Sequence, residues 1–202
     1  MLSSARASNV RKSPKRVVLG YASGTPTHDR DLSSIEDGII WTLGRYNHVD
    51  VHLMGYIRKS QRLARFGTRV QRRPFVAWHA LPQRLRDIDI NLAPFCLDSE
   101  FSNGKSALKY MEAGLVGVPT IASPMPAYLN TIESGNNGFI AANDMEWRDH
   151  LQYLIENEQA RNEMGQAAQA TVQKTDSLQN RAQTLKKILK KVGSKPASPA
   201  RA

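Results

Sequence analysis

The segment from Asn91 to Ser123 (NLAPFCLDSEFSNGKSALKYMEAGLVGVPTIAS) limits the possible folds of this chain more than any other. Apolar runs at Ile88–Ala93 and Val118–Ala122 predict two strands, and the pattern between them predicts a helix from Lys105 to Leu115. Strand, helix and strand in this order are typical of a parallel crossover unit. The chain is therefore expected to bury a sheet with helices on both of its faces.

The same alternation extends over residues 17–175, which predicts an α/β fold with a doubly wound parallel sheet. Further strands are expected at Val17–Tyr21, Val51–Met54, Thr68–Val70, Phe75–Ala77 and Phe139–Ala141, and helices at Asp31–Tyr46, Leu81–Asp87, Pro126–Ser134, Glu146–Glu156 and Gln159–Gln173. The ordered series of strand and helix signals, rather than any one of them, supports this fold class.

Basic tails flank this region. Residues 1–16 carry a net charge of +5 and residues 181–202 one of +7, so residues 17–180 sum to −2 of the total +10. We expect a basic disordered arm or linker at 1–16, one domain at 17–175, a basic amphipathic helix at 176–192 and a disordered tail at 193–202. The tails either contact an anionic partner (nucleic acid, acidic lipid or an acidic protein surface) or are simply solvated. The apolar stripe of Leu178–Val192 is expected to dock on the sheet layer or on another subunit.

Cys96 is the only cysteine, so the chain has no internal disulfide and fits a reducing compartment such as the cytoplasm. No apolar run reaches eighteen residues and no apolar h-region follows Met1, so neither a transmembrane segment nor a secretory signal is predicted. Peripheral membrane contact is compatible with the basic tails. The Ser- and Arg-containing start also resembles a short organellar transit peptide.

Three loops lie where ligands of open α/β sheets bind, beyond the carboxyl ends of the strands. The first runs from Ser23 to His28; its Gly24 permits close approach of a ligand and its hydroxyls can donate to phosphate. The second, 95–104, holds Asp98 and Glu100, which are either acid/base groups or a solvated acidic loop. The third opens the helix predicted at Lys105.

Two residues of that helix suggest a ligand. Lys105 and Glu112 are seven residues apart, which in a helix is two turns on one face, or roughly 10.5 Å along the axis. Together with the helix N-terminus, the lysine could hold a diphosphate and the glutamate a sugar diol, as a nucleotide-sugar requires. The alternative is a solvated helix with scattered charges.

Two other groupings are weaker. His28, Asp29 and Asp31 match no metal-binding spacing, so no metal site is predicted. Trp78 is interpreted as a core residue in preference to a platform for a nucleobase.

The stretch N-G-K-S-A-L-K-Y-M-E-A-G-L-V-G-V-P-T-I-A-S closely resembles the donor-binding half of group 1 glycosyltransferases, the retaining enzymes of the GT-B fold. Similar stretches at 17–32, 73–95, 131–141 and 144–174 extend the resemblance over about 17–175. It implies a Rossmann-like domain, one half of a GT-B fold, that binds a UDP-, GDP- or ADP-sugar as substrate and needs no cofactor. The donor-binding residues it implies, together with the loops above, are Ser23, Gly24, Thr25, His28, Gly104, Lys105, Ser106, Lys109 and Glu112.

Within this set, the resemblance implies that Lys105, Ser106 and the helix N-terminus hold the diphosphate and that Glu112 holds the ribose, with Lys109 supporting either. The sequence departs from the family at two points. The first of the family's paired glutamates, which contacts the donor sugar, would fall at Gly104 and is missing. The usual arginine–lysine pair for the diphosphate is also missing as a clean match, so Arg30 or Lys105 would substitute.

The resemblance covers the C-terminal half of the family only, and the sixteen residues before it leave no room for the acceptor-binding half. We therefore expect glycosyl transfer to require an N-terminal half or a partner chain, and the isolated chain to be inactive. The sequence identifies no catalytic residue. The alternative is a catalytically inactive glycosyltransferase-like domain that serves as a structural or adaptor subunit.

Overall fold

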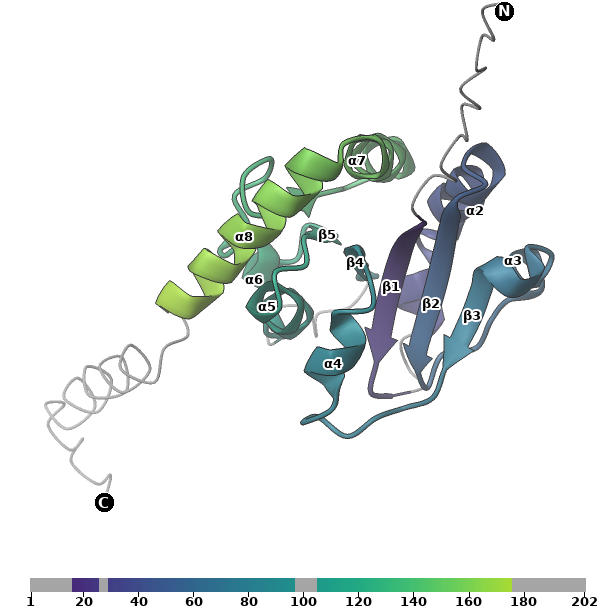
Figure 1. The fold of residues 1–202 in the computed structure, drawn as a ribbon, viewed down its shortest axis with the longest axis horizontal. Helices are drawn as coiled ribbons and strands as arrows, with labels where there is room; N and C mark the ends of the chain where they lie inside the picture. The colour runs from purple at the N-terminus through teal and green to yellow at the C-terminus, as the bar shows by residue number, and fades with distance from the viewer. Residues whose placement is uncertain (1–15, 26–28, 97–104, 176–202) are drawn as a thin grey trace, which may run out of the picture.

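The computed structural model describes residues 16–25, 29–96 and 105–175. They form one six-stranded parallel sheet in the order β3-β2-β1-β4-β5-β6, with helices on both faces (Figure 1). The strands are β1 Val17–Ser23, β2 Val49–Gly55, β3 Val70–Arg73, β4 Ile90–Ala93, β5 Thr120–Ala122 and β6 Phe139–Ile140. The predicted doubly wound α/β fold is thereby confirmed.

The helices follow the strands in the alternation that the sequence predicts. They are α1 Asp29–Ser33, α2 Glu36–Arg45, α3 Gln61–Ala64, the 3-10 turn η2 Gly67–Arg69, α4 Leu81–Leu85, α5 Leu108–Leu115, α6 Pro126–Leu129, α7 Asp144–Glu156 and α8 Glu158–Thr175. Within the described ranges, none of these helices is long and apolar enough to cross a bilayer.

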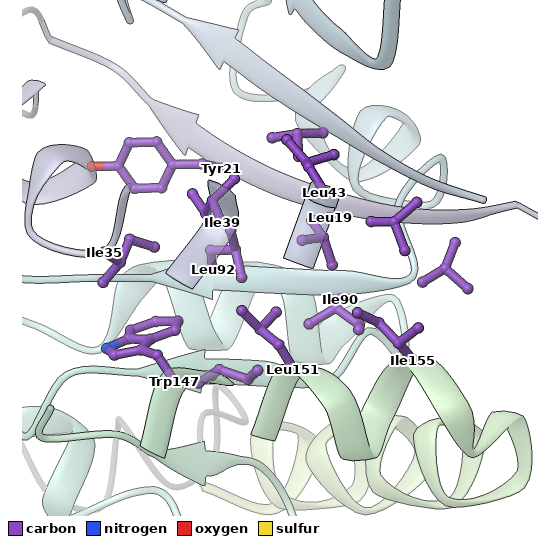
Figure 2. Close-up of a cluster of buried hydrophobic side chains, with 14 of the residues drawn as sticks. Leu19, Tyr21, Ile35, Ile39, Leu43, Ile90, Leu92, Trp147, Leu151 and Ile155 are labelled. Atoms are coloured by element: carbon purple, nitrogen blue, oxygen red, sulfur yellow. The ribbon is translucent and has the colours of Figure 1, made fainter. Parts of the chain in front are cut away.

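One face of the sheet packs against α2, α3 and α7. Leu19, Ile90 and Leu92 of the central strands meet Ile39 of α2 and Leu151 of α7 in a continuous apolar cluster (Figure 2). These side chains are almost fully buried, and such burial is the main source of stability in a domain of this size. The cluster anchors both halves of the sheet on a shared core.

The opposite face packs against α4 and α5, and α8 covers α5 from outside. Tyr110 and Ala113 of α5 are fully buried, and Gly114 lies so close to Val172 and Ala168 of α8 that a side chain at position 114 would collide with Val172. α5 is therefore held from two sides, by the sheet and by α8.

α7 shows how local sequence sets a boundary. Its N-cap residue, Asn143, accepts a hydrogen bond from the Glu146 amide at 3.0 Å, and the Glu146 carboxylate accepts one from the Ala142 amide at 2.7 Å. This reciprocal arrangement satisfies amides that the first turn leaves free. It starts the helix at Asp144, two residues before the position expected from apolar periodicity.

Several sequence predictions are wrong in detail. The strand expected at Thr68–Val70 starts only at Val70, because Thr68 and Arg69 belong to η2, and the helix expected over Pro126–Ser134 ends at Leu129. The single helix expected over Asp31–Tyr46 is two helices, because the chain breaks between α1 and α2 at Ser34 and Ile35. The strand expected at Phe75–Ala77 is irregular backbone, since β3 ends at Arg73. The helix expected from Lys105 begins only at Leu108, with Ala107 as its N-cap. The tails, His28, Asp98, Glu100, Gly104 and Leu178–Val192 lie outside the described residues, and the predicted domain boundaries stay predictions.

Candidate functional site

A pocket of about 790 Å³ lies at the carboxyl ends of the strands, where the order reverses between β1 and β4. The reversal leaves a crevice because the chain winds away from this point in both directions, and ligands of such sheets bind there. The lining comes from the ends of β1, β2, β4 and β5, from the loop after β3, and from α5.

Six of the nine predicted donor-binding residues line this pocket: Ser23, Gly24, Lys105, Ser106, Lys109 and Glu112. Thr25 is exposed beside it and bonded to Ser23, whose hydroxyl donates to the Thr25 carbonyl at 2.7 Å. The two others, His28 and Gly104, lie outside the described ranges. Of the two proposed substitutes for the missing arginine–lysine pair, Lys105 is at the pocket, whereas Arg30 is an exposed residue of α1 and does not line it.

The expected spacing of Lys105 and Glu112 on one helix is wrong, because Lys105 precedes α5. Its ammonium lies over the Phe95 ring, 4.3 Å from the centroid, so it is held by the loop after β4 and not by the helix. On α5 itself, the charged pair is Lys109 and Glu112, three residues apart and therefore neighbours on one face.

Lys109 is the most perturbed cation of the pocket. Its ammonium donates to the Ala22 carbonyl at the end of β1 and lies 4.6 Å from the centroid of the Tyr21 ring. Burial lowers its pKa to about 8; Asp31 and Glu112 oppose this shift, and Lys105 adds to it. The side chain therefore links α5 to β1 while it keeps a charge at neutral pH.

The acids of the site are partly buried as well. Burial raises the pKa of Glu112, and Lys109 acts against the rise. Asp31, only 6% exposed, accepts a hydrogen bond from the Cys96 amide at 2.9 Å and joins α1 to the loop after β4. Burial, reinforced by Asp31, also raises the pKa of the Tyr21 and Tyr128 hydroxyls, so both stay protonated.

Two residues that sequence reasoning did not assign to the site help to position its walls. The Asn91 amide, buried in β4, donates to the Lys109 carbonyl at 3.2 Å and to the Thr120 hydroxyl at 3.0 Å, which fixes α5 over the sheet. Gly55 ends β2 with a φ of +90°, and a side chain there would collide with the Ser23 carbonyl. A polar residue within an apolar strand was the available signal for Asn91.

The opposite wall of the pocket is aromatic and exposed. Trp78 is 84% exposed, so its interpretation as a core residue is wrong. It lines the pocket with Phe75, which stacks on Tyr56 at 5.0 Å between ring centroids. Arg84 of α4 also lines this side.

The site offers three cations, two carboxylates and two serine hydroxyls around a cavity large enough for a nucleotide-sized ligand. Across the residues that the structure describes, no group of three His, Cys, Asp or Glu side chains could hold a metal ion. The arrangement therefore suits an anionic, hydroxyl-rich ligand held by charge and hydrogen bonds.

Solved structures share this fold. HepE from Anabaena, in complex with UDP and glucose, superimposes with a TM-score of 0.69 at 20% identity, over 88% of this chain and 49% of HepE. The C-terminal domain of LpcC, a group 1 family glycosyl transferase from Francisella tularensis, gives a TM-score of 0.65 at 18% identity, over 82% of this chain and 88% of that domain. Sucrose-phosphate synthase from Thermosynechococcus elongatus gives 0.66 at 14% identity, over 89% of this chain and 46% of the synthase.

The chain thus spans about half the length of HepE and of sucrose-phosphate synthase and matches most of the separate C-terminal domain of LpcC. No curated protein sequence matches it. The model of one sequence family, described as glycosyl transferase-like, matches residues 39–187. This match extends over most of the sheet and the pocket, and with the shared fold it shows that the chain belongs to the glycosyl transferase-like family and has the Rossmann-like fold of one half of a GT-B glycosyltransferase.

Proposed function

We propose that this chain is the donor-binding part of a retaining glycosyltransferase and that its pocket holds the diphosphate and ribose of a nucleotide-sugar. The observation that carries the proposal is the pairing of Lys109 and Glu112, one turn apart on α5, in a pocket at the reversal point of the sheet. HepE, which has the same fold, is bound to UDP and glucose in its crystal structure.

The diphosphate takes the position between the start of α5 and the loop after β1. There it meets the ammonium groups of Lys109 and Lys105, the Ser106 hydroxyl and the first amides of α5, which has no polar side chain at its N-cap residue, Ala107, to satisfy them. In transfer, these groups stabilise the negative charge that builds on the departing diphosphate as the sugar becomes an oxocarbenium ion.

The ribose takes the position next to Glu112. A carboxylate accepts hydrogen bonds from both hydroxyls of a diol, and a charged hydrogen bond of this kind contributes roughly 1.5–3 kcal/mol. Burial raises the pKa of Glu112, but the adjacent Lys109 favours the carboxylate, so Glu112 can still accept these hydrogen bonds. We also infer that transfer needs an acceptor-binding half, supplied as another domain or another chain.

A thermal-shift screen of the full chain against UDP, GDP and ADP and their sugars tests the binding step. A ligand that binds the native state alone raises the melting temperature. Glu112→Gln should weaken the effective nucleotide roughly 10- to 100-fold, the range that corresponds to the diol contact. Glu163→Gln, an exposed change on α8, is the matched control and should bind as the wild type does.

The absence of a shift with every diphosphate would contradict donor binding and favour the adaptor function, for which the missing glutamate at position 104 is the specific argument. Rapid sugar transfer by the purified chain alone would contradict the need for an acceptor-binding half.

A further inference from the structure

An acid lies on either side of the ammonium group of Lys109. Glu112 follows Lys109 by one turn on α5, whereas Asp31 belongs to α1, whose Leu32 packs in the cluster on the opposite face of the sheet. Both negative charges favour the ammonium form of Lys109, Asp31 more strongly than Glu112, so both carboxylates lie near it. A ligand whose anionic group meets Lys109 therefore has a carboxylate on either side of that group.

Lys109 approaches Asp31 by crossing the end of β1. Tyr21 belongs to the apolar cluster on the α2 side of the sheet (Figure 2), whereas α5 covers the other side. The Lys109 ammonium nevertheless lies 4.6 Å from the centroid of the Tyr21 ring, and it donates to the Ala22 carbonyl at the end of β1. Its side chain therefore passes over the carboxyl end of the strand, from α5 toward α1.

The hydroxyl of Tyr128, near Asp31, has no hydrogen-bond partner in the described part of the chain. Tyr128 of α6 lines the pocket and is only 3% exposed. Across residues 16–25, 29–96 and 105–175, the side-chain atoms that are fully buried without a partner are the Tyr110 hydroxyl and Arg148 Nε. The unbonded Tyr128 hydroxyl is not one of them, so its oxygen remains accessible from the pocket. Burial, then Asp31 and then Glu112 raise the pKa of Tyr128, so the hydroxyl keeps its proton.

A phenol and a carboxylate placed in this way suit a ligand that carries hydroxyl groups. The phenol can both donate and accept a hydrogen bond, whereas the carboxylate only accepts. Asp31 accepts one hydrogen bond from the Cys96 amide at 2.9 Å, and a carboxylate has room for about four. A sugar hydroxyl can accept from Tyr128 while it donates to Asp31. An apolar group in the same position would leave both side chains without these bonds, at a cost in binding.

We propose that Asp31 and Tyr128 bind the sugar of the donor and replace the glutamate that is missing at position 104. This assignment rests on the proposed function, in which Lys109 holds the diphosphate and Glu112 holds the ribose. In a nucleotide-sugar, the sugar and the ribose are attached to opposite ends of the diphosphate. The order Glu112, Lys109 and Asp31 in the pocket therefore matches the order ribose, diphosphate and sugar in the ligand.

The test compares each nucleoside diphosphate with its sugar derivative, by calorimetric titration of the full chain with UDP and UDP-glucose, GDP and GDP-mannose, and ADP and ADP-glucose. Titration at about pH 6.5 keeps Lys109 protonated, since its pKa is about 8. Tyr128→Phe removes the hydroxyl and keeps the buried ring, so the fold is retained. We expect this variant to bind the diphosphate within about twofold of the wild type, and its sugar derivative about 2- to 10-fold more weakly.

Asp31→Asn gives a second, independent measurement. It keeps an oxygen that can accept from the Cys96 amide, but it also removes a negative charge near the diphosphate site. The readout is therefore the affinity for the sugar derivative relative to the diphosphate, which should fall about 10-fold. The matched controls are Tyr153→Phe and Asp149→Asn, at exposed positions of α7, and both should leave this ratio unchanged.

Three results have different meanings. If Tyr128→Phe weakens the diphosphate and its sugar derivative by the same factor, Tyr128 contacts the nucleotide and the proposed sugar site is wrong. If it changes neither affinity while the wild type binds the diphosphate, the sugar site is also wrong, but donor binding stands. If the wild type binds no diphosphate at all, the proposed function is contradicted and the sugar site with it.

Discussion

The two walls of the pocket differ in how they are built. On the α5 side, Asp31 and Tyr128 are buried and Lys109 is partly buried, and all three are connected to the strands by hydrogen bonds and packing. On the β3–α4 side, Phe75 and Trp78 extend from an irregular loop into solvent. The first wall keeps charged groups in fixed positions at a cost in stability, whereas the second leaves apolar surface uncovered. Charged groups in fixed positions suit recognition of a defined anionic ligand, whereas an exposed apolar surface suits contact with a separate partner after the domain has folded.

The largest difference between the walls should appear in stability. Tyr128→Ala removes a side chain that is 3% exposed in the cluster under the α5 wall, and should lower the free energy of unfolding by about 3–5 kcal/mol. Urea denaturation followed by circular dichroism measures this change. A loss below about 1 kcal/mol would mean that the α5 wall relaxes as freely as a surface loop, and would remove the distinction between the walls.

A charge in the fixed wall should oppose folding. The folded-state pKa of Lys109, about 8, is below the value of 10.5 for a free lysine, so its ammonium costs about 3 kcal/mol at pH 7. This penalty is complete below pH 8 and disappears as the pH rises toward 10.5. Lys109→Met should therefore be more stable than the wild type at pH 7, with a smaller advantage near pH 10, while nucleotide binding is lost. A less stable variant at pH 7 would show that the bond to the Ala22 carbonyl outweighs the cost of burial.

The same lysine predicts how donor binding depends on pH. If the protonated ammonium holds the diphosphate, affinity for a nucleotide-sugar should be constant near neutrality and fall about tenfold per pH unit above pH 8, until the higher pKa of the bound state is reached. Lys109→Arg keeps its charge and should flatten this limb. At low pH, affinity should fall as Glu112 is protonated. Because the pKa of Glu112 is raised, this fall should begin at a higher pH than it would for an exposed glutamate. Calorimetric titration over pH checks both limbs; a wild-type profile flat through pH 9 would separate Lys109 from the diphosphate.

The smallest effect is expected on the open wall. Trp78→Ser should change the free energy of unfolding by less than about 0.5 kcal/mol, since the indole is almost fully in solvent. The same urea denaturation experiment applies. A loss of several kcal/mol would show that the loop packs on the domain, and the contrast between the walls would have to be abandoned.

Sequence patterns predicted the sheet well and the loops poorly, and the reason is physical. Apolar runs such as Val17–Tyr21 and Ile88–Ala93 identify strands because a parallel sheet buries both faces. The start of α5 at Leu108 depends instead on where the preceding loop packs. Lys105 packs over the ring of Phe95, a residue outside the segment in which the helical pattern was read. No local signal separates an exposed Trp78 from a buried one.

The candidate site, like the fold, could be predicted only in part from the sequence. Lys105, Lys109 and Glu112 were found because the resemblance pointed to one helix, but Asp31, the acid with the largest charge effect on Lys109, was not. Asp31 lines the pocket but belongs to α1, in another strand–helix unit, and its carboxylate accepts a hydrogen bond from the Cys96 amide. Only the order of the strands brings these two units together, and that order has no signature in either segment.

The most direct test of the account is the pKa of Lys109, measured by NMR on lysine side chains labelled with ¹³C, with Lys109→Met for assignment. Without ligand, the account predicts a pKa of about 8, well below those of exposed lysines. With a saturating nucleoside diphosphate, the pKa should rise markedly, because an adjacent anion favours the ammonium. A ligand that binds and leaves the pKa of Lys109 unchanged would contradict the claim that this lysine holds the diphosphate.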